Sequence, residues 1–267
     1  MKLTLGISPC PNDTFMFDAL IHNKIDTLGL DFDVIFKDIQ ELNTSAMQSK
    51  LDVTKASFYA FTHCVESYIL LDSGSALGTN CGPLFIKKPS KNISSESKIA
   101  IPGRYTTANM LFDIVYPDYN NKTEIIFSEI ERSIQNEKVD AGVIIHENRF
   151  TYLDNGLEKV RDLGEFWFQQ TGLPLPLGGI IIKRKIPREI KRKVQDVLKE
   201  SIKYAFKNPQ SSREFVRCYA QEMKQEVIDS HIKLYVNDFS ISLSKKGREA
   251  VNYIFDVLDK STEDIFV

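Results

Sequence analysis

The chain has 267 residues, enough for one large domain or two lobes around a substantial core. Apolar residues make up 42% and charged residues 26%, the ordinary composition of a globular protein. A formal net charge of −2 excludes the strongly basic surface typical of nucleic-acid binding, so we expect no nucleic-acid partner. No apolar run approaches the roughly 18 residues that a membrane span needs, so we expect no membrane span either.

The N-terminal segment and the cysteines indicate a reducing compartment. The apolar stretch LTLGI after Lys2 is too short for the apolar region of a secretory signal. Four cysteines are scattered without C-x-x-C spacing: Cys10, Cys64, Cys81 and Cys218. This pattern favours thiols over disulfides or a zinc site. We therefore expect a cytoplasmic protein.

The first part of the chain alternates between strand-like and helix-like segments. Strands are predicted at residues 2–8, 30–36, 51–57 and 82–88. Helices are predicted at residues 13–24 and 39–50, and the short strand at 51–57 leads into a further helical stretch that contains His63. Apolar residues bounded by turn residues define each of these segments.

The alternation continues after a polar, loop-like break at residues 89–97. Further strands are predicted at residues 98–103, 123–128, 140–146 and 178–184. Helices are predicted at residues 106–116 and 129–138, and after Pro187 the pattern is helical almost without interruption. Such alternation predicts an α/β fold with mostly parallel sheets and helices on both faces.

Two segments have the character of crossings between lobes, GPLFIKKP before the polar break and LPLPLGGIIIKR before the C-terminal helices. They predict a discontinuous first lobe, residues 1–88 and 181–267, that contains the C-terminal helices. The second lobe is then residues 89–180. Two α/β lobes joined in this way form a ligand cleft between them that closes on a small molecule. A single doubly wound domain is the alternative.

Small polar residues gather where strands end and helices begin. Ser8 and Asn12 follow the first strand, Ser57 ends the third, and Thr106 and Thr107 precede the helix at 106–116. Ligands of open α/β sheets bind beyond the carboxyl ends of the strands, and helix N-termini attract carboxylates and phosphates. Ordinary helix capping is the alternative for each residue. If the fold brings them together, they predict a small anionic ligand.

His146 follows the apolar run GVII directly and is therefore predicted at a strand end. An imidazole titrates near neutral pH and suits general acid–base chemistry. A histidine that caps the strand or forms a hydrogen bond between lobes is the alternative. Glu147 beside it either orients the ring or begins a helix. The remaining histidines fall in helix-like segments, where packing or exposure is expected: His22, His63 and His231.

The motifs SPCPNDTF, KASFYAF, GRYTTANMLF and DAGVIIHE, in this order and spacing, resemble the 1,4-dihydroxy-6-naphthoate synthases of the futalosine route to menaquinone. The resemblance runs essentially from end to end and includes the LPLPLGG segment. It implies a two-lobed, periplasmic-binding-protein-like fold of type II. It also implies a carbon–carbon lyase that converts cyclic dehypoxanthinyl futalosine to 1,4-dihydroxy-6-naphthoate and dihydroxyacetone.

The same resemblance implies the roles of individual residues. The acid–base histidine of the family falls on His146. The substrate contacts of the family fall on Lys55, Ala56, Ser57, Thr107 and Ala108. From their positions at strand ends, Ser8, Asn12 and Thr106 are further candidates for lining the cleft, whose floor the SPCPND turn would shape. Cys10 is expected to pack rather than react, because the sequence places no base beside it. No metal or other cofactor is implied.

Two other functions remain open from the sequence. One is the related chorismate dehydratase of the same pathway, which eliminates the enolpyruvyl group of chorismate. The other is a solute-binding protein that captures a small anion without catalysis. The absence of a recognisable secretory signal favours an enzyme over an exported binder.

Overall fold

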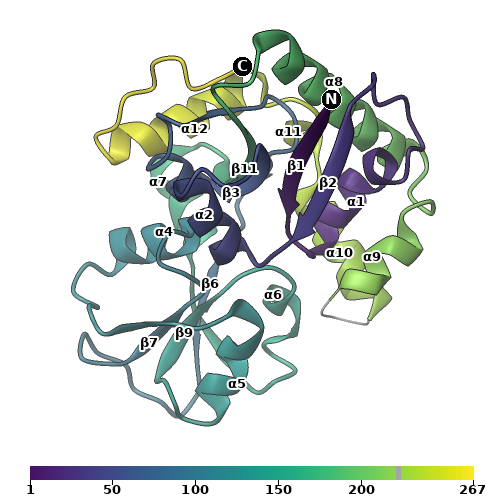
Figure 1. Cartoon of the computed structure of the whole chain (residues 1–267). Helices are drawn as coiled ribbons and strands as arrows, with labels where there is room; N and C mark the ends of the chain where they lie inside the picture. The colour runs from purple at the N-terminus through teal and green to yellow at the C-terminus, as the bar shows by residue number, and fades with distance from the viewer. Residues whose placement is uncertain (221–223) are drawn as a thin grey trace. The chain divides into compact units, whose positions relative to one another are not determined.

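The computed structural model describes residues 1–220 and 224–267, which divide into two compact units (Figure 1). Unit 1 comprises Met1–Leu77 and Pro176–Val267, and unit 2 comprises Gly78–Leu175. The chain thus passes between units earlier than the sequence-based boundaries after residues 88 and 180. The physical reason is that the strand at Leu84–Lys87 forms its ladder with strands of unit 2.

Unit 1 contains a mixed sheet with strand order β2-β1-β3-β11-β4, and β5 pairs with β11. Its strands are β1 (Lys2–Ile7), β2 (Asp31–Phe36), β3 (Val53–Ser57), β4 (Tyr68–Leu70), β5 (Ala76–Gly78) and β11 (Leu175–Lys183). Its helices are α1 (Pro11–Ile21), α2 (Ile39–Met47), α3 (Phe58–Phe61), α8 (Arg188–Lys207), α9 (Arg213–Tyr219), α10 (Gln225–Tyr235), α11 (Asp238–Ile241) and α12 (Ser244–Val257).

Helices cover both faces of this sheet. Side chains alternate between the two faces along β1, and each set packs against different helices. Leu3, Leu5 and Ile7 join a buried cluster with apolar residues of α1 and α8. Gly6 faces the other way, where a Cβ atom would lie 2.9 Å from Leu42 Cδ2 of α2. The sheet is therefore buried on both sides at β1.

Unit 2 contains a second mixed sheet with strand order β10-β6-β9-β7-β8. Its strands are β6 (Leu84–Lys87), β7 (Ile99–Ile101), β8 (Lys122–Glu124), β9 (Ala141–Ile144) and β10 (Glu158–Asp162). Its helices are α4 (Thr107–Val115), the 3₁₀ helix η1 (Phe127–Glu129), α5 (Ile130–Gln135), α6 (Asn148–Thr151) and α7 (Leu163–Thr171).

Helices cover both faces of the unit 2 sheet as well. Phe85 of β6 packs edge-on against Phe112 of α4, with ring centroids 5.0 Å apart. On the opposite face, a Cβ atom on Gly142 of β9 would lie 2.6 Å from Ile130 Cγ2 of α5. The predicted α/β class with helices on both faces is confirmed.

The sheets differ from the sequence-based expectation in one respect: each combines parallel and antiparallel pairs. In unit 1, β1 runs parallel to β2 and β3, whereas β11 runs antiparallel to β3 and β4. In unit 2, β7 runs parallel to β8 and β9, whereas β6 runs antiparallel to β9 and β10. Each of these antiparallel pairs includes either β6 or β11.

Several predicted elements differ in extent, and two of them show where the chain departs from its sequence pattern. The helix predicted from residue 13 starts at Pro11 and ends at Ile21, because Asn23 adopts a left-handed backbone with φ of 52°. The strand predicted at 123–128 ends at Glu124, and η1 begins at Phe127. No helix in the described part of the chain combines the length and the apolar composition needed to cross a membrane.

The start of α7 lies against the backbone near Cys81, and we expect this contact to restrict Gly164 to glycine. A Cβ atom there would lie 2.1 Å from the Cys81 carbonyl carbon and 2.3 Å from its oxygen, and a backbone cannot move aside as a flexible side chain can. Gly164→Ala should lower the free energy of unfolding by about 1–3 kcal/mol or more. Chemical denaturation measures this change.

The exposed Gln170 of the same helix provides the control. Gln170→Ala should change stability by no more than about 0.5 kcal/mol. Equal midpoints for Gly164→Ala and the wild type would show that the contact is looser than the structure indicates.

Candidate functional site

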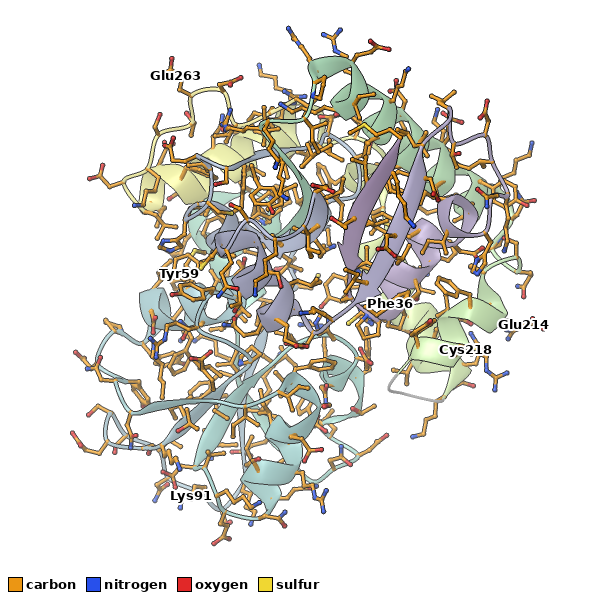
Figure 2. All side chains as sticks on the ribbon, viewed as in Figure 1. Phe36, Tyr59, Lys91, Glu214, Cys218 and Glu263 are labelled. Atoms are coloured by element: carbon orange, nitrogen blue, oxygen red, sulfur yellow. The ribbon has the colours of Figure 1, made fainter. Side chains whose placement is uncertain are left out.

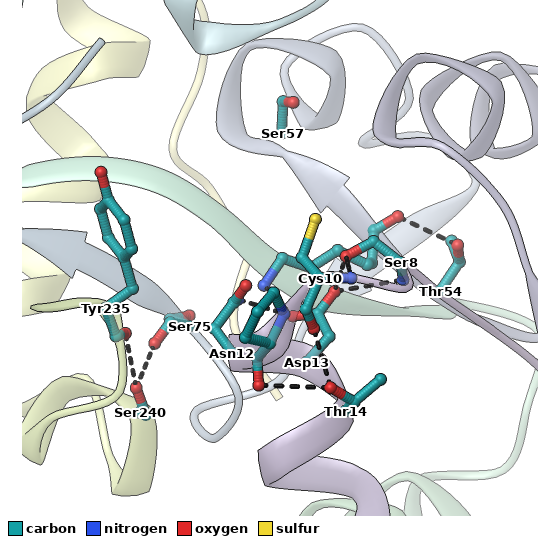
Figure 3. A network of polar contacts seen from close by, with 12 residues as sticks. Ser8, Cys10, Asn12, Asp13, Thr14, Thr54, Ser57, Ser75, Tyr235 and Ser240 are labelled. Atoms are coloured by element: carbon teal, nitrogen blue, oxygen red, sulfur yellow. Dashed lines mark hydrogen bonds and ion pairs between the residues drawn. The ribbon is translucent and has the colours of Figure 1, made fainter. Parts of the chain in front are cut away.

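The SPCPND turn folds around its own carboxylate. Asp13, the third residue of α1, has no exposed surface. Its Oδ2 accepts hydrogen bonds from the Ser8 backbone N–H at 3.2 Å and the Ser8 hydroxyl at 2.7 Å. Its Oδ1 accepts one from Asn12 Nδ2 at 2.9 Å (Figure 3). Pro11 stands at the first helical position, where its fixed φ and missing N–H favour a helix start.

A buried cation from β3 completes this network. Lys55 Nζ lies 2.9 Å from Asp13 Oδ1, and the two side chains are 7% and 0% exposed. Burying two charges is costly unless they are paired and their remaining hydrogen-bonding capacity is satisfied. Asp13 therefore holds the Lys55 ammonium beside the carboxyl ends of β1 and β3. The geometry brings Ser8, Asn12 and Lys55 into one cluster.

Ser57 ends β3, and because β1 and β3 are parallel it belongs to the same sheet edge as Ser8. It occupies the N-cap position of α3, but its side chain forms no capping hydrogen bond. Instead the buried Asn43 of α2 donates to Ser57 Oγ at 3.0 Å and accepts from the Ser57 N–H at 2.9 Å. Asn43 thus fixes the position of the Ser57 hydroxyl oxygen. Because this oxygen accepts from Asn43 Nδ2, the hydroxyl proton of Ser57 points away from Asn43 Nδ2.

The two threonines predicted as site residues, Thr106 and Thr107, lie at the start of helix α4. Thr106 caps α4: its Oγ1 accepts from the Asn109 N–H at 3.2 Å and donates to the Gly103 carbonyl at 2.7 Å. Its hydroxyl therefore serves the helix end, which is the ordinary capping role. Thr107 and Ala108 are the first two residues of α4, and both are buried.

His146 lies two residues beyond the end of β9, as the sequence predicted, and its backbone is strained. Its φ is 57°, a left-handed conformation that costs a residue other than glycine about 1–2 kcal/mol. The imidazole packs edge-on against the buried ring of Phe127, with centroids 4.7 Å apart. Strained residues of this kind persist only where the surrounding structure holds them, and they concentrate at functional sites.

The other histidines have structural surroundings. His22 is the C-cap of α1 and its Nδ1 lies 2.8 Å from Asp18 Oδ1. His63 lies in the turn after α3, where burial and then the charge of Lys260 lower its pKa. His231 is fully buried in α10 and packs edge-on against Tyr235. Among the histidines in the described part of the chain, only His146 follows the end of a strand.

No sequence pattern predicted the ionic contact that follows His146. Arg149 of α6 donates to the Gly82 carbonyl and to Asp162 Oδ2, both at 2.6 Å. The other oxygen of Asp162 accepts from the N–H groups of Gly164 and Glu165 and so caps α7. The spacing of Asp162 and Glu165, three residues apart before an apolar run, was an available capping signal. Nothing in the local sequence pairs Asp162 with Arg149.

A cluster of aromatic side chains at the end of β2 packs helix α9 against the sheet of unit 1. Phe36 stacks on Tyr219 with ring centroids 4.2 Å apart, and Phe215 contacts both edge-on. Figure 2 shows Phe36 beside α9, which exposes Glu214 and Cys218. These aromatic rings serve packing.

The cysteines form no disulfide among the described residues, as the sequence predicted. Burial raises the pKa of the Cys64 thiol to about 12. Burial likewise raises the pKa of Cys81, opposed by the positive charge of Arg149. Both thiols are therefore held in the unreactive protonated form at neutral pH.

Comparison with solved structures shows that the chain has a periplasmic-binding-protein-like fold. A Candida albicans protein described as having the generic periplasmic binding protein fold matches with a TM-score of 0.73. The match covers 99% of this chain and 93% of that chain at 11% identity. A crystal structure of a protein from Archaeoglobus fulgidus matches with a TM-score of 0.92 and 33% identity over 97% of each chain.

Comparison of sequences identifies the family. The family model described as "Menaquinone biosynthesis" matches residues 3–260, and the chain belongs to this family. A relative from Thermus thermophilus is 38% identical over 253 residues, which cover 95% of this chain and 92% of the relative. That relative is named 1,4-dihydroxy-6-naphthoate synthase. The family predicted from the four motifs, and the periplasmic-binding-protein-like fold implied by it, are confirmed.

The Asp13–Lys55 pair leads to a test of stability. Asp13→Asn keeps the shape of the side chain but leaves the Lys55 ammonium buried without an opposite charge. We expect the free energy of unfolding to fall by about 3–5 kcal/mol. Asp13→Asn combined with Lys55→Met should be less destabilised than the single variant, because the orphaned charge is gone.

The exposed Asp33 of β2 provides the control, and Asp33→Asn should change stability by no more than about 0.5 kcal/mol. Denaturant unfolding of the wild type, Asp13→Asn, Lys55→Met, the double variant and the Asp33→Asn control measures these differences. A double variant whose loss equals the sum of the two single losses would show that the two charges are not coupled.

Proposed function

We propose that the chain is a carbon–carbon lyase that converts cyclic dehypoxanthinyl futalosine to 1,4-dihydroxy-6-naphthoate and releases dihydroxyacetone. The observation that carries this proposal is the similarity to a relative named for that product over 95% of the chain. Membership of the menaquinone biosynthesis family supports it independently of any single residue.

In this proposal His146 is the general base. Its neutral imidazole takes an acidic proton from the carbon next to a carbonyl group of the substrate. The electron pair of the broken C–H bond then forms a double bond as the bond to the sugar-derived fragment breaks. That fragment leaves with the bonding electron pair and takes up a proton, and the ring system becomes aromatic. The buried Phe127 ring limits the orientations available to the imidazole. A positioned base of this kind typically contributes about 10²–10⁴-fold to a rate.

Lys55, Ser57 and Thr107 are proposed to bind the carboxylate and other polar groups of the substrate. Lys55 supplies a positive charge that Asp13 holds in place, and Ser57 supplies a hydroxyl that Asn43 orients. Ala56 and Ala108 flank these groups and present small side chains. Lys55–Ser57 belong to unit 1 and Thr107–Ala108 belong to unit 2.

The experiment that tests the proposal is incubation of the purified protein with cyclic dehypoxanthinyl futalosine. Absorbance of the naphthoate product should appear, and dihydroxyacetone should form in equal amount. A parallel incubation with chorismate should leave chorismate intact. A stable complex without product would instead favour a binding protein, and solved structures of this fold include an alkanesulfonate-binding protein.

Substitution of His146 should abolish most of this turnover without unfolding the protein. Asparagine is the suitable replacement, because it tolerates the left-handed backbone better than other residues with a side chain of this size. His146→Asn should lower kcat by about 10²–10⁴-fold and leave thermal unfolding nearly unchanged. Steady-state kinetics and calorimetry measure the two effects, and near-normal kcat would assign the base elsewhere.

The proposed role of Thr107 predicts a binding defect rather than a defect in chemistry. Thr107→Val keeps the side-chain shape and removes the hydroxyl, and a hydrogen bond to a charged group contributes about 1.5–3 kcal/mol. We therefore expect a KM about 10–100-fold higher, with a smaller change in kcat. Thr123→Val on β8 is the matched control and should keep the wild-type KM. An unchanged KM in Thr107→Val would exclude the residue from the substrate contacts.

A further inference from the structure

Arg149 connects three segments of unit 2 through one side chain. Its Nη1 donates to the Gly82 carbonyl and its Nη2 to Asp162 Oδ2, each at 2.6 Å. The Asp162 side chain has no exposed surface, and its second oxygen is occupied by the first turn of α7. The planar guanidinium reaches two acceptors at once, which a lysine ammonium on a flexible stem does not reproduce.

The acceptors of Arg149 belong to a rigid part of unit 2. A Cβ atom on Gly82 would lie 2.8 Å from Gly164 Cα, so these two backbones are in direct contact. Leu163 N–H also donates to the Pro83 carbonyl at 2.9 Å. The arginine therefore attaches the short helix α6 to a tightly packed region.

The segment around α6 is attached on a second side to α5. Asn155 Nδ2 donates to Glu131 Oε2 at 2.6 Å. Burial raises the pKa of Glu131, and hydrogen bonds from Asn155 and Asn148 oppose that shift. Helix α6 is thus held between α5 and the region of Gly82.

His146 lies three residues before Arg149, and the backbone of His146 is strained. Its φ of 57° is maintained although the residue is not glycine. The Arg149 N–H donates to the His146 carbonyl at 3.4 Å, so the arginine and the histidine share one turn of the chain. A strained conformation persists only when its surroundings determine it, and the two hydrogen bonds of the Arg149 guanidinium fix the turn that follows His146.

We propose that Arg149 is a positioning residue: its guanidinium holds α6 against Gly82 and Asp162 and thereby keeps the His146 imidazole in place against Phe127. The inference rests on the proposed function, in which His146 removes the substrate proton. Arg149 does not itself act on the substrate. Its loss should leave substrate binding in place and misalign the base.

A spectroscopic experiment tests the positioning without any turnover. Protein labelled with ¹³C-histidine contains four imidazoles, and the signal of His146 is the one absent from His146→Asn. The wild type should show a nuclear Overhauser effect between this imidazole and the Phe127 ring. Arg149→Gln should lose that effect and shift the His146 signal, while the other three histidine signals stay unchanged. Arg132→Gln, whose arginine side chain is 74% exposed on α5, is the matched control and should keep all four.

Steady-state kinetics provides the second readout. A displacement of about 1 Å can reduce a rate by about 10²-fold, so kcat of Arg149→Gln should fall by about that factor while KM stays near the wild-type value. Arg149→Lys keeps a charge opposite Asp162 but cannot bridge to Gly82 as well, and should recover kcat only in part. If Arg149→Gln does not fold, Arg149→Lys carries both measurements.

The outcomes separate the two proposals. An unchanged nuclear Overhauser effect in the arginine variants overturns the positioning role, whatever happens to kcat. An unchanged kcat in an active enzyme overturns it as well. A wild-type protein that produces no naphthoate removes the proposed function, and the nuclear Overhauser effect then still decides whether Arg149 positions His146.

Discussion

A carboxylate with no exposed surface, that of Asp13, constrains much of unit 1 around it. Removed from water, it needs donors for both oxygens, and the chain supplies a backbone N–H, a hydroxyl, an amide and an ammonium. These donors come from the end of β1, the start of α1 and β3, so the three elements must meet at one point. The proline-containing turn at residues 8–13 brings Ser8 and Asn12 to the same carboxylate.

The two units supply the proposed chemistry in different ways. In unit 1 the relevant groups are paired, Asp13 with Lys55 as an ion pair and Asn43 with Ser57 by hydrogen bonds, and this pairing fixes their directions. In unit 2 the relevant group is fixed through the backbone, because His146 occupies a conformation that only its neighbours maintain. Preorganised groups do not need to rearrange during a reaction, so both arrangements suit catalysis.

The sequence predicted the features that depend on local pattern. The strands with dense apolar residues, the α/β alternation and the strand-end positions of Ser57 and His146 all follow from periodicity and turn residues. Pattern could not predict β10, because its sequence EKVRD is mostly charged and one edge of the strand is solvated. It also could not join Lys55 to Asp13 or Arg149 to Asp162, since each pair is brought together only by the completed fold. The sequence pattern also did not predict that each sheet is mixed. The direction of a strand is set by the path of the chain between strands, and the residues of a single strand do not encode it.

The route of the chain has a consequence for biosynthesis. Strand β11 lies between β3 and β4 in the sheet of unit 1, yet it is made only after all of unit 2 has been translated. A nascent chain emerging from the ribosome therefore cannot complete the N-terminal unit in the order of its sequence. The inserted unit, Gly78–Leu175, has all of its own strands available first and can fold while the edge of β3 still waits for its partner. During that interval β3 presents an unpaired edge, to which a strand of another chain can pair.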